Sequence, residues 1–238
     1  MPVCVRDNGH VPRQRPTLSP GAAVAAAWLV AVALVAIMRV TVGWPAPGDL
    51  AASPDALERG HLWLLATSAL VIEGPPVVQI GATAVLIWVI VHRFGAPTFW
   101  WAAVAGHVGS TLAVYAGIAL VWLFDAHAVR DVTDAPDYGI SAVWAACMGV
   151  VCVAGAAGAL QRARLATALG AGCLVTFLVL VPADGEVSDF EHLVAFLAGA
   201  AVAARALHHE RRGDADPLRP TRLPSLRRRP RAAARAGR

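Results

Sequence analysis

The sequence predicts an all-α, polytopic membrane protein with six transmembrane helices. Of its 238 residues, 57% are hydrophobic and only 15% are charged. Several apolar stretches approach or exceed the roughly 20 residues that a helix needs to cross a bilayer core of about 30 Å. These stretches are continuous, whereas the strands of a membrane β-barrel alternate apolar and polar residues. A helical membrane bundle is therefore favoured over a soluble domain or a barrel.

The N-terminal part of the chain predicts one spanning helix. Residues 1–20 are polar and basic, and residues 21–38 form the first apolar stretch. A basic start before an apolar stretch also occurs in signal peptides. This stretch is longer than a signal core, and no clear small-x-small cleavage site follows it, so we expect a retained helix. Residues 43–60, which are rich in proline, glycine and aspartate, contribute no spanning helix.

The next apolar segment, residues 61–72, is too short to span a bilayer. Trp63 lies near its start, and tryptophan favours the membrane–water interface. The Gly74-Pro75-Pro76 sequence ends the segment. We therefore expect residues 61–72 to lie in, or dip into, the outer leaflet.

Five further spanning helices are expected after this segment. Their predicted ranges are 76–92, 98–124, 138–160, 165–181 and 190–207. The chain then divides into a cytoplasmic N-terminal segment, a six-helix membrane domain and a disordered tail rich in arginine and proline. These parts comprise residues 1–20, 21–208 and 209–238.

The distribution of arginine predicts the orientation of the helices. Arginines gather before the first helix, in the short turns near Arg93 and Arg162, and in the C-terminal tail. The loops at 125–137 and 182–189 are acidic and contain one arginine, Arg130. Because positively charged loops favour the cytoplasm, we expect a multi-pass protein of the plasma membrane with both termini cytoplasmic. The first outer loop fits less well, since arginines flank it.

The C-terminal tail carries ten arginines between Arg211 and Arg238, and the chain contains no lysine. A basic tail can bind nucleic acid, but no aromatic residue is interleaved with these arginines to stack on bases. The preferred interpretation is a disordered tail held at the anionic cytoplasmic surface of the lipid bilayer, with no nucleic-acid partner.

The four cysteines predict neither a disulfide framework nor a metal site. No C-x-x-C pair is present, and three of the four cysteines lie inside apolar segments. They are typical of small residues in a helical core.

The candidate chemistry comes from Ser141 and His192, each near the beginning of a predicted helix. Both helices are predicted to enter the membrane from the outer side. Ser141 and His192 are therefore expected at the same depth, on the order of 5 Å below the start of each helix. A serine becomes nucleophilic when a base removes its proton, and histidine is the usual base. A serine in a first turn also serves as a cap or a packing residue. A histidine near a helix end can equally bond to a loop.

Small residues follow each of these two side chains at helical spacing. Such faces allow two helix backbones to approach closely, so we expect the helices at 138–160 and 190–207 to pack directly. The small residues are Ala145 and Gly149 after Ser141, and Ala195, Gly199 and Ala203 after His192.

In the order and spacing of these motifs the chain resembles the rhomboid family of intramembrane serine proteases. The family's G-x-S-G motif corresponds here to Gly139-Ile140-Ser141-Ala142. Its H-x-x-G-x-x-x-G motif corresponds to His192-Leu193-Val194-Ala195, with Gly199 at the later glycine. Counting back from Gly95 by the family's spacing places Gln79 at the asparagine of the H-x-x-x-N pair and Pro75 at its histidine. Residues 61–72 correspond to the membrane-embedded first loop. The resemblance covers residues 21–207.

The resemblance implies a Ser-His dyad that cleaves transmembrane protein substrates near the outer membrane face. Ser141 would attack the scissile carbonyl and His192 would act as general base. The Ser141 backbone N–H and the Gln79 amide would hold the oxyanion, with Gly139 in a supporting role. This mechanism requires no cofactor and no metal.

Three departures from the family pattern keep a second interpretation open. Ala142 replaces the glycine after the nucleophile, Ala145 replaces a frequent tyrosine, and Pro75 cannot donate a hydrogen bond from its side chain. The pattern fits a divergent protease, and it also fits an inactive relative that binds transmembrane partners. A transporter or channel is disfavoured, because the spans are nearly free of charge.

The third predicted helix contains His107 and Ser110. A histidine inside a membrane helix is a candidate functional residue. The simpler interpretation, which we prefer, is an interhelical hydrogen bond.

Overall fold

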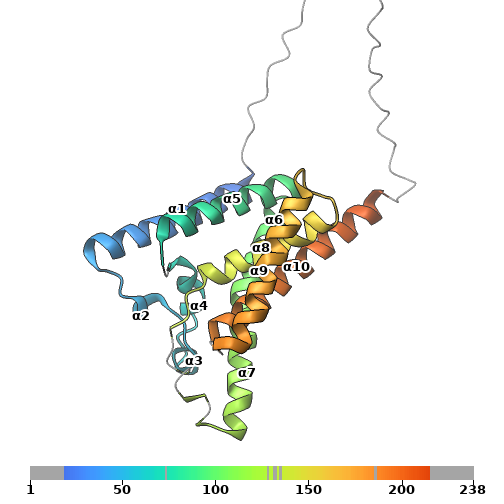
Figure 1. The fold of residues 1–238 in the computed structure, drawn as a ribbon. Helices are drawn as coiled ribbons and strands as arrows, with labels where there is room; N and C mark the ends of the chain where they lie inside the picture. Colours follow the sequence, from blue (N-terminus) through green and yellow to red (C-terminus); the bar gives the residue numbers. More distant parts are fainter. Residues whose placement is uncertain are drawn as a thin grey trace, which may run out of the picture.

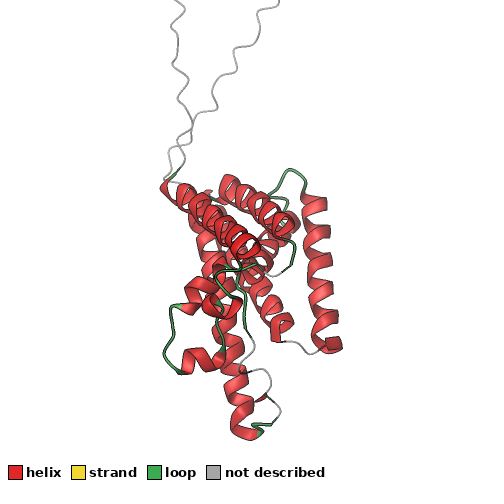
Figure 2. Ribbon diagram, turned by 90° about the vertical axis from the view of Figure 1, so that its left-hand side faces the viewer, coloured by secondary structure: helices red, strands yellow, loops and turns green. Residues whose placement is uncertain are grey.

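The computed structural model describes residues 19–72, 74–127, 129–130, 133, 136–184 and 187–214. In this part of the chain 82% of the residues are helical and no strand is present, which confirms the predicted all-α class. The one strand-like contact among these residues is an isolated antiparallel bridge between Ala52 and Asp137. Figure 2 shows the result as helices joined by short loops.

Five helical segments in the described ranges are long and apolar enough to cross a membrane, by length and composition. They are α1 (Pro20–Val42), α5 (Pro76–Phe94), the continuous run α6, η2 and α7 (Ala96–Val104, Ala105–Gly109, Ser110–Phe124), α9 (Ala163–Asp184) and α10 (Val187–Asp214). The helix expected at 138–160 is α8 (Ile140–Ala156), which has 17 residues and is the shortest of the apolar helices that were expected to span. Helix α10 continues past the predicted boundary at 208.

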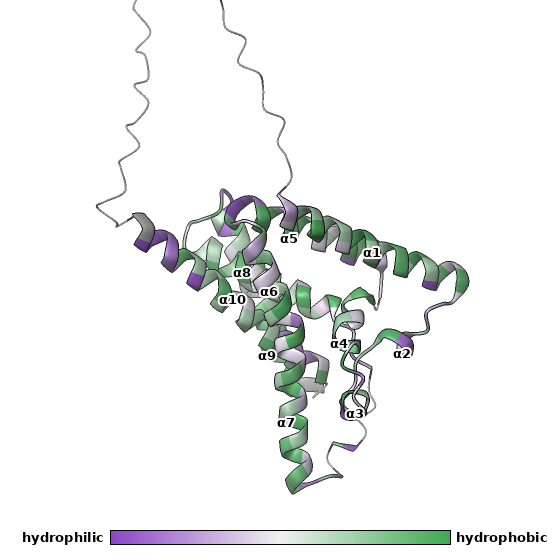
Figure 3. Cartoon of the chain, turned by 180° about the vertical axis from the view of Figure 1, so that it is seen from behind, coloured by the Kyte–Doolittle hydropathy of each residue, from purple (hydrophilic) through white to green (hydrophobic). Residues whose placement is uncertain are grey.

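Large apolar side chains cover the outside of the helices. Val40, Val77, Leu123 and Phe124 are each more than three-quarters exposed. Figure 3 shows mostly hydrophobic residues along α1, α5 and α7, and hydrophilic residues near the C-terminal end of α10. Backbone groups inside a helix are satisfied internally, so such apolar helices tolerate a lipid environment. These features are consistent with a multi-pass membrane protein.

Helix α8 is the central element of the structure. Residues 145–151 of this helix are all buried, which covers every face over nearly two turns. Its most extensive packing is against α10, followed by α9, with further contacts to α6 and α5. Figure 1 shows α1 and α5 side by side along one edge of the molecule, and α7 projecting away from them.

Small residues allow α8 and α10 to touch backbone to backbone, as the sequence predicts. A methyl group added to Gly149 would overlap the backbone carbonyl of Phe196. One added to Gly199 would overlap the backbone carbonyl of Ala146. The two contacts are reciprocal, so neither helix can accept a larger residue at its glycine without moving the other.

Arg93 links three elements at one end of the molecule. The Arg93 Nε atom, at the end of α5, donates to the Ala159 carbonyl at 2.8 Å, in the turn after α8. Its two terminal nitrogens pair with the Glu210 carboxylate on α10 at 2.9 and 3.0 Å. A bidentate arginine–carboxylate pair fixes geometry as well as charge. The turns that the sequence assigns to one side of the membrane therefore lie together.

The region between α1 and α5 contains more helix than the sequence indicated. Helices α2 (Pro47–Leu50) and α3 (Pro54–Glu58) form within residues 43–60. Ser53 caps α3 through a 3.1 Å bond from the Ala56 N–H, and Pro54 occupies its first turn. The interfacial segment at 61–72 folds as α4 (Leu64–Thr67) and the short helix η1 (Ser68–Leu70).

The expected cytoplasmic segment before Ser19, the arginine-rich tail beyond Asp214, and Cys4 lie outside the described residues. The predicted attachment of the tail to anionic lipid therefore stays a prediction.

We expect Gly199→Ala to lower the free energy of unfolding by about 1–3 kcal/mol, because overpacking a close contact forces the backbone to shift. The matched control is Gly172→Ala on α9, where an added methyl group meets nothing within 4 Å. The measurement is thermal unfolding of the full chain in detergent, followed by tryptophan fluorescence. Equal unfolding temperatures for the two variants would contradict the tight α8–α10 contact.

Candidate active site

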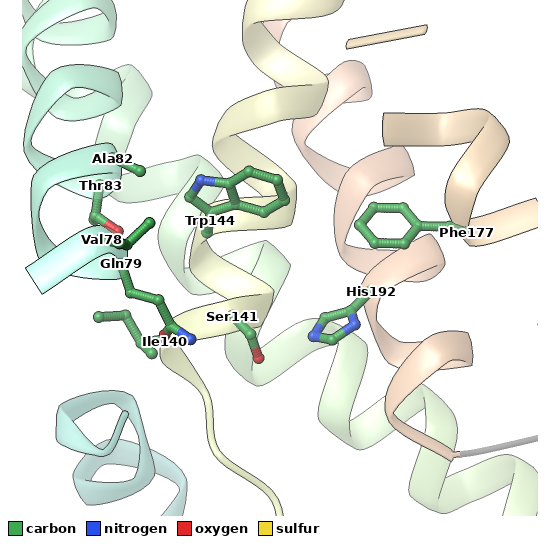
Figure 4. Close-up of a pocket in the computed structure, with 9 residues that line it drawn as sticks. All are labelled: Val78, Gln79, Ala82, Thr83, Ile140, Ser141, Trp144, Phe177 and His192. Atoms are coloured by element: carbon green, nitrogen blue, oxygen red, sulfur yellow. The ribbon is translucent and has the colours of Figure 1, made fainter. Parts of the chain in front are cut away.

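Ser141 and His192 line the same cavity, which has a volume of about 300 Å³. The cavity is bounded by α5, α8, α9 and α10, and its walls are mostly apolar. Figure 4 shows the Ser141 hydroxyl and the His192 ring facing one another across it. The side chains used below are Gln79, Thr83, Ser141, Trp144, Phe177 and His192.

The Ser141 hydroxyl is engaged by its own chain. Its Oγ donates to the Tyr138 backbone carbonyl at 3.0 Å. In the part of the chain that the structure describes, no hydrogen bond joins Ser141 to His192. Serine side chains move between staggered rotamers, and catalytic hydrogen bonds often tighten only when substrate binds. The two side chains thus line one cavity without a hydrogen bond between them in this structure.

The His192 ring rests on an aromatic side chain that the sequence did not identify. It stacks on Phe177 of α9, with ring centroids 5.5 Å apart and an angle of 29° between planes. Ala145, at the position where the resemblance expects a tyrosine, is fully buried in the α8 interior. Phe177 belongs to a different helix, so sequence spacing around Ser141 could not reveal it. Trp144 lines the same cavity.

Helix α5 contributes two polar side chains to the cavity, one turn apart. The Gln79 side chain extends towards the first turn of α8 (Figure 4). The hydroxyl of Thr83 is buried and has no hydrogen-bond partner among the described residues. Residues four apart share one face of a helix, and this spacing from Gln79 is the signal that could have pointed to Thr83. Pro75 immediately precedes the helix and caps it without a side-chain hydrogen bond.

Gly139 supports the start of α8 and does not provide a free donor to the cavity. Its backbone N–H donates to the Ser68 carbonyl at 3.1 Å. A side chain on Gly139 would overlap the ring of His107. Glycine is therefore required at this position by the histidine packed against it. Ser141 is the second residue of α8, in the first turn, where backbone N–H groups have no intrahelical acceptor.

His107 lies outside the cavity and forms interhelical hydrogen bonds. Its Nε2 atom is 2.8 Å from the Leu65 carbonyl and 3.1 Å from the Ser68 hydroxyl. The ring is 3% exposed. The structure therefore supports the simpler of the two interpretations of this residue, a link between η2 and the segment at 61–72.

A second polar cluster lies at the starts of α8 and α10. Asp137 and Glu191 both contact Thr111 of α7, at 3.1 and 2.6 Å. The sequence predicted a helix from residue 190, and the structure begins α10 earlier, at Val187, and buries Glu191 to 4% exposure. The sequence signals that could have found the cluster are its positions: Asp137 lies four residues before Ser141, and Glu191 immediately precedes His192.

The described residues contain no group of three or more histidine, cysteine or acidic side chains placed to hold a metal ion. Cys147, Cys152 and Cys173 are free thiols.

Comparison with known proteins gives no match: no family model, no curated protein and no solved structure is similar to this chain. Any assignment of function therefore rests on the site itself.

Because the Thr83 hydroxyl is buried without a partner, we expect Thr83→Val to raise the free energy of unfolding by about 1 kcal/mol. The matched control is Thr167→Val, since the Thr167 hydroxyl donates to the Ala163 carbonyl at 2.9 Å. Thermal unfolding in detergent measures both. A Thr83→Val variant that is less stable than the Thr167→Val variant would show that the Thr83 hydroxyl is satisfied in the native protein.

Proposed function

We propose that this chain is a rhomboid-like intramembrane serine protease with six membrane spans, located in the plasma membrane with both termini cytoplasmic. It cleaves transmembrane protein substrates near the outer membrane face. The observation that carries the proposal is that Ser141 and His192, from two different helices, face one cavity. Nucleophile and base from separate elements, converging on a space for substrate, are what acyl transfer requires.

Helix α8 would be the fourth of the six proposed spans, and its short length fits a position inside the bundle. A helix of 17 residues is about 26 Å long, which is less than the bilayer core of about 30 Å. Its neighbours cover it on every side over the buried turns. Such a helix can begin below the membrane surface without exposing its first backbone N–H groups to lipid. Ser141 would then lie within the depth of the membrane.

The proposed reaction follows the chemistry of serine nucleophiles. His192 takes the Ser141 hydroxyl proton as the oxygen attacks the scissile carbonyl, and the carbonyl π electrons move to the oxygen. The tetrahedral intermediate collapses, the C–N bond breaks, and the imidazolium returns the proton to the leaving amine. Water, deprotonated by the same imidazole, then hydrolyses the acyl-enzyme. The hydroxyl must first rotate from the Tyr138 carbonyl to the imidazole.

The oxyanion would be stabilised from two sides. The Ser141 N–H belongs to the first turn of α8, where the helix dipole favours negative charge. The Gln79 side-chain amide approaches from α5 (Figure 4). The stack of His192 on Phe177 restricts the orientation of the imidazole ring. Each of these groups is in place before substrate binds, which is the condition for electrostatic stabilisation of a transition state.

A second candidate function is a catalytically inactive rhomboid-like protein that binds transmembrane partners. The observation that favours it is the bond from Ser141 to the Tyr138 carbonyl, which leaves the serine unpaired with His192. Pro75 and Ala142 are further departures from the family pattern. The two functions share a fold, so they are separated by reactivity.

We expect a fluorophosphonate probe to label the full chain in membranes, and Ser141→Ala or His192→Ala to abolish labelling. The same variants should abolish cleavage of a single-span reporter, because each removes one member of the dyad. Ser188→Ala, an exposed serine near the start of α10, is the matched control and should retain both signals. Labelling that is equal in wild type and Ser141→Ala, or absent from both, supports the partner-binding function instead.

We expect Gln79→Leu to lower kcat by about 10²–10³-fold with a smaller effect on KM, since one oxyanion donor is lost. Val77→Ala is the matched control, because Val77 is a neighbour on α5 whose side chain is 84% exposed. Initial rates of reporter cleavage in proteoliposomes separate the two parameters. A Gln79→Leu enzyme with unchanged kcat would remove Gln79 from the oxyanion site.

A further inference from the structure

The cluster of polar side chains outside the cavity joins the two helices that carry Ser141 and His192. This carboxyl cluster consists of Ser110, Thr111, Tyr115, Asp137 and Glu191. Ser110 and Thr111 are fully buried, and Glu191 is 4% exposed. Such a group is costly in an apolar bundle unless its hydrogen bonds are complete. The polar atoms of the cluster therefore need hydrogen-bond partners within it.

The hydroxyl groups of the cluster converge on the two carboxyl groups. Thr111 Oγ1 lies 2.6 Å from Glu191 Oε1 and 3.1 Å from Asp137 Oδ2. Ser110 Oγ lies 3.2 Å from Glu191 Oε1, and the Tyr115 hydroxyl lies 3.5 Å from Asp137 Oδ2. A single threonine oxygen is thus the meeting point of both acids.

The Thr111 hydroxyl alone cannot satisfy all the acceptors that meet at it. It has one proton, yet its oxygen is within hydrogen-bond distance of both carboxyls and of the His107 carbonyl, at 2.8 Å. A carbonyl oxygen and an ionised carboxylate only accept. A proton on one of the two carboxyls lets Thr111 accept there and donate elsewhere, and it removes one of two charges from a buried site.

No cation in the described ranges neutralises the pair. The ion pairs formed by these residues are Arg59–Asp55 and Arg93–Glu210, and neither includes the cluster. His107 is nearby, but its Nε2 atom donates to the Leu65 carbonyl and its buried Nδ1 atom has no hydrogen-bond partner among the described residues, so a second ring proton would be left unsatisfied. The remaining titratable groups that face the cluster are Tyr115 on α7, and Asp189 and His192 on α10.

We propose that Asp137 and Glu191 hold one proton between them and, through Thr111, fix the starts of α8 and α10 relative to each other. Asp137 lies four residues before Ser141, and Glu191 is adjacent to His192, so the three act as positioning residues for that pair. The catalytic consequence rests on the function proposed above, whereas the shared proton and the link between helices do not.

Loss of the shared proton weakens the link. Two adjacent carboxylates repel one another in a low-dielectric interior, and Thr111 can donate to only one of them. In the unfolded chain both acids are ionised above their ordinary range near pH 4. At neutral pH this carboxyl pair therefore binds one more proton in the folded protein than in the unfolded chain. The stability that the pair contributes is lost as the pH rises.

The decisive measurement is thermal unfolding of the full chain in detergent between roughly pH 7 and pH 10, above the range in which histidines titrate. The unfolding temperature of wild type is expected to fall by several degrees with rising pH. Glu191→Gln should flatten this dependence, because an amide donates permanently in place of the proton. Thr111→Val should lower stability at every pH. Glu58→Gln, an exposed substitution of the same kind, should behave as wild type.

Infrared spectroscopy tests the wild-type protein directly, whether or not a variant folds. Wild type should show the C=O stretch of a protonated carboxyl group at neutral pH, and Glu191→Gln or Asp137→Asn should lose it. A wild-type spectrum without this band, or a Glu191→Gln protein with the full wild-type pH dependence, overturns the proposal. If the band and the pH dependence are present while Ser141 is unreactive, the protease function fails and the shared proton stands. If Ser141 is reactive while the band and the pH dependence are absent, the shared proton fails and the protease function stands.

Discussion

The backbone contact between α8 and α10 is the constraint on which the rest of the structure depends. Gly149 and Gly199 each leave room for a carbonyl of the opposite helix, so the two helices approach as closely as their backbones permit. That contact sets where the first turns of the helices lie. Ser141 and His192 share a cavity because of it, and Asp137 and Glu191 meet at Thr111 for the same reason. Larger residues where α8 and α10 meet would move the two helices apart. They would separate Ser141 from His192 and Asp137 from Glu191 at the same time.

The sequence predicted those parts of the molecule that depend on local pattern. Apolar length gave the helices, and small residues at four-residue spacing gave the α8–α10 contact. The sequence also gave the two side chains of the candidate dyad, which the structure places at one cavity. It missed groups whose role depends on long-range contact. Phe177 lies under His192 because α9 packs beside α10, and Glu191 is buried because Ser110 and Thr111 of α7 pack against the start of α10.

The N-terminal ends of α8 and α10 contain two polar regions with opposite character. In the carboxyl cluster, hydroxyls and carboxyls satisfy one another, and the region is closed. In the cavity, the Thr83 hydroxyl is unpartnered and the Ser141 hydroxyl is held only by its own backbone. A buried group without a partner lowers stability. The closed cluster holds the helices in place, and the cavity keeps polar groups available to a bound molecule.

The contacts of Arg93 anchor one end of α5, so any tilt of this helix would turn about that end. Arg93 fastens the C-terminal end of this helix to the turn after α8 and to α10, while Val78 and Gln79 near the opposite end line the cavity. The displacement produced by a tilt about the fastened end grows with distance from it, so it is largest near Gln79. Ser141 and His192 belong to helices that pack directly against each other. Such a tilt therefore acts on the α5 wall of the cavity rather than on the contact between the two helices that carry these side chains.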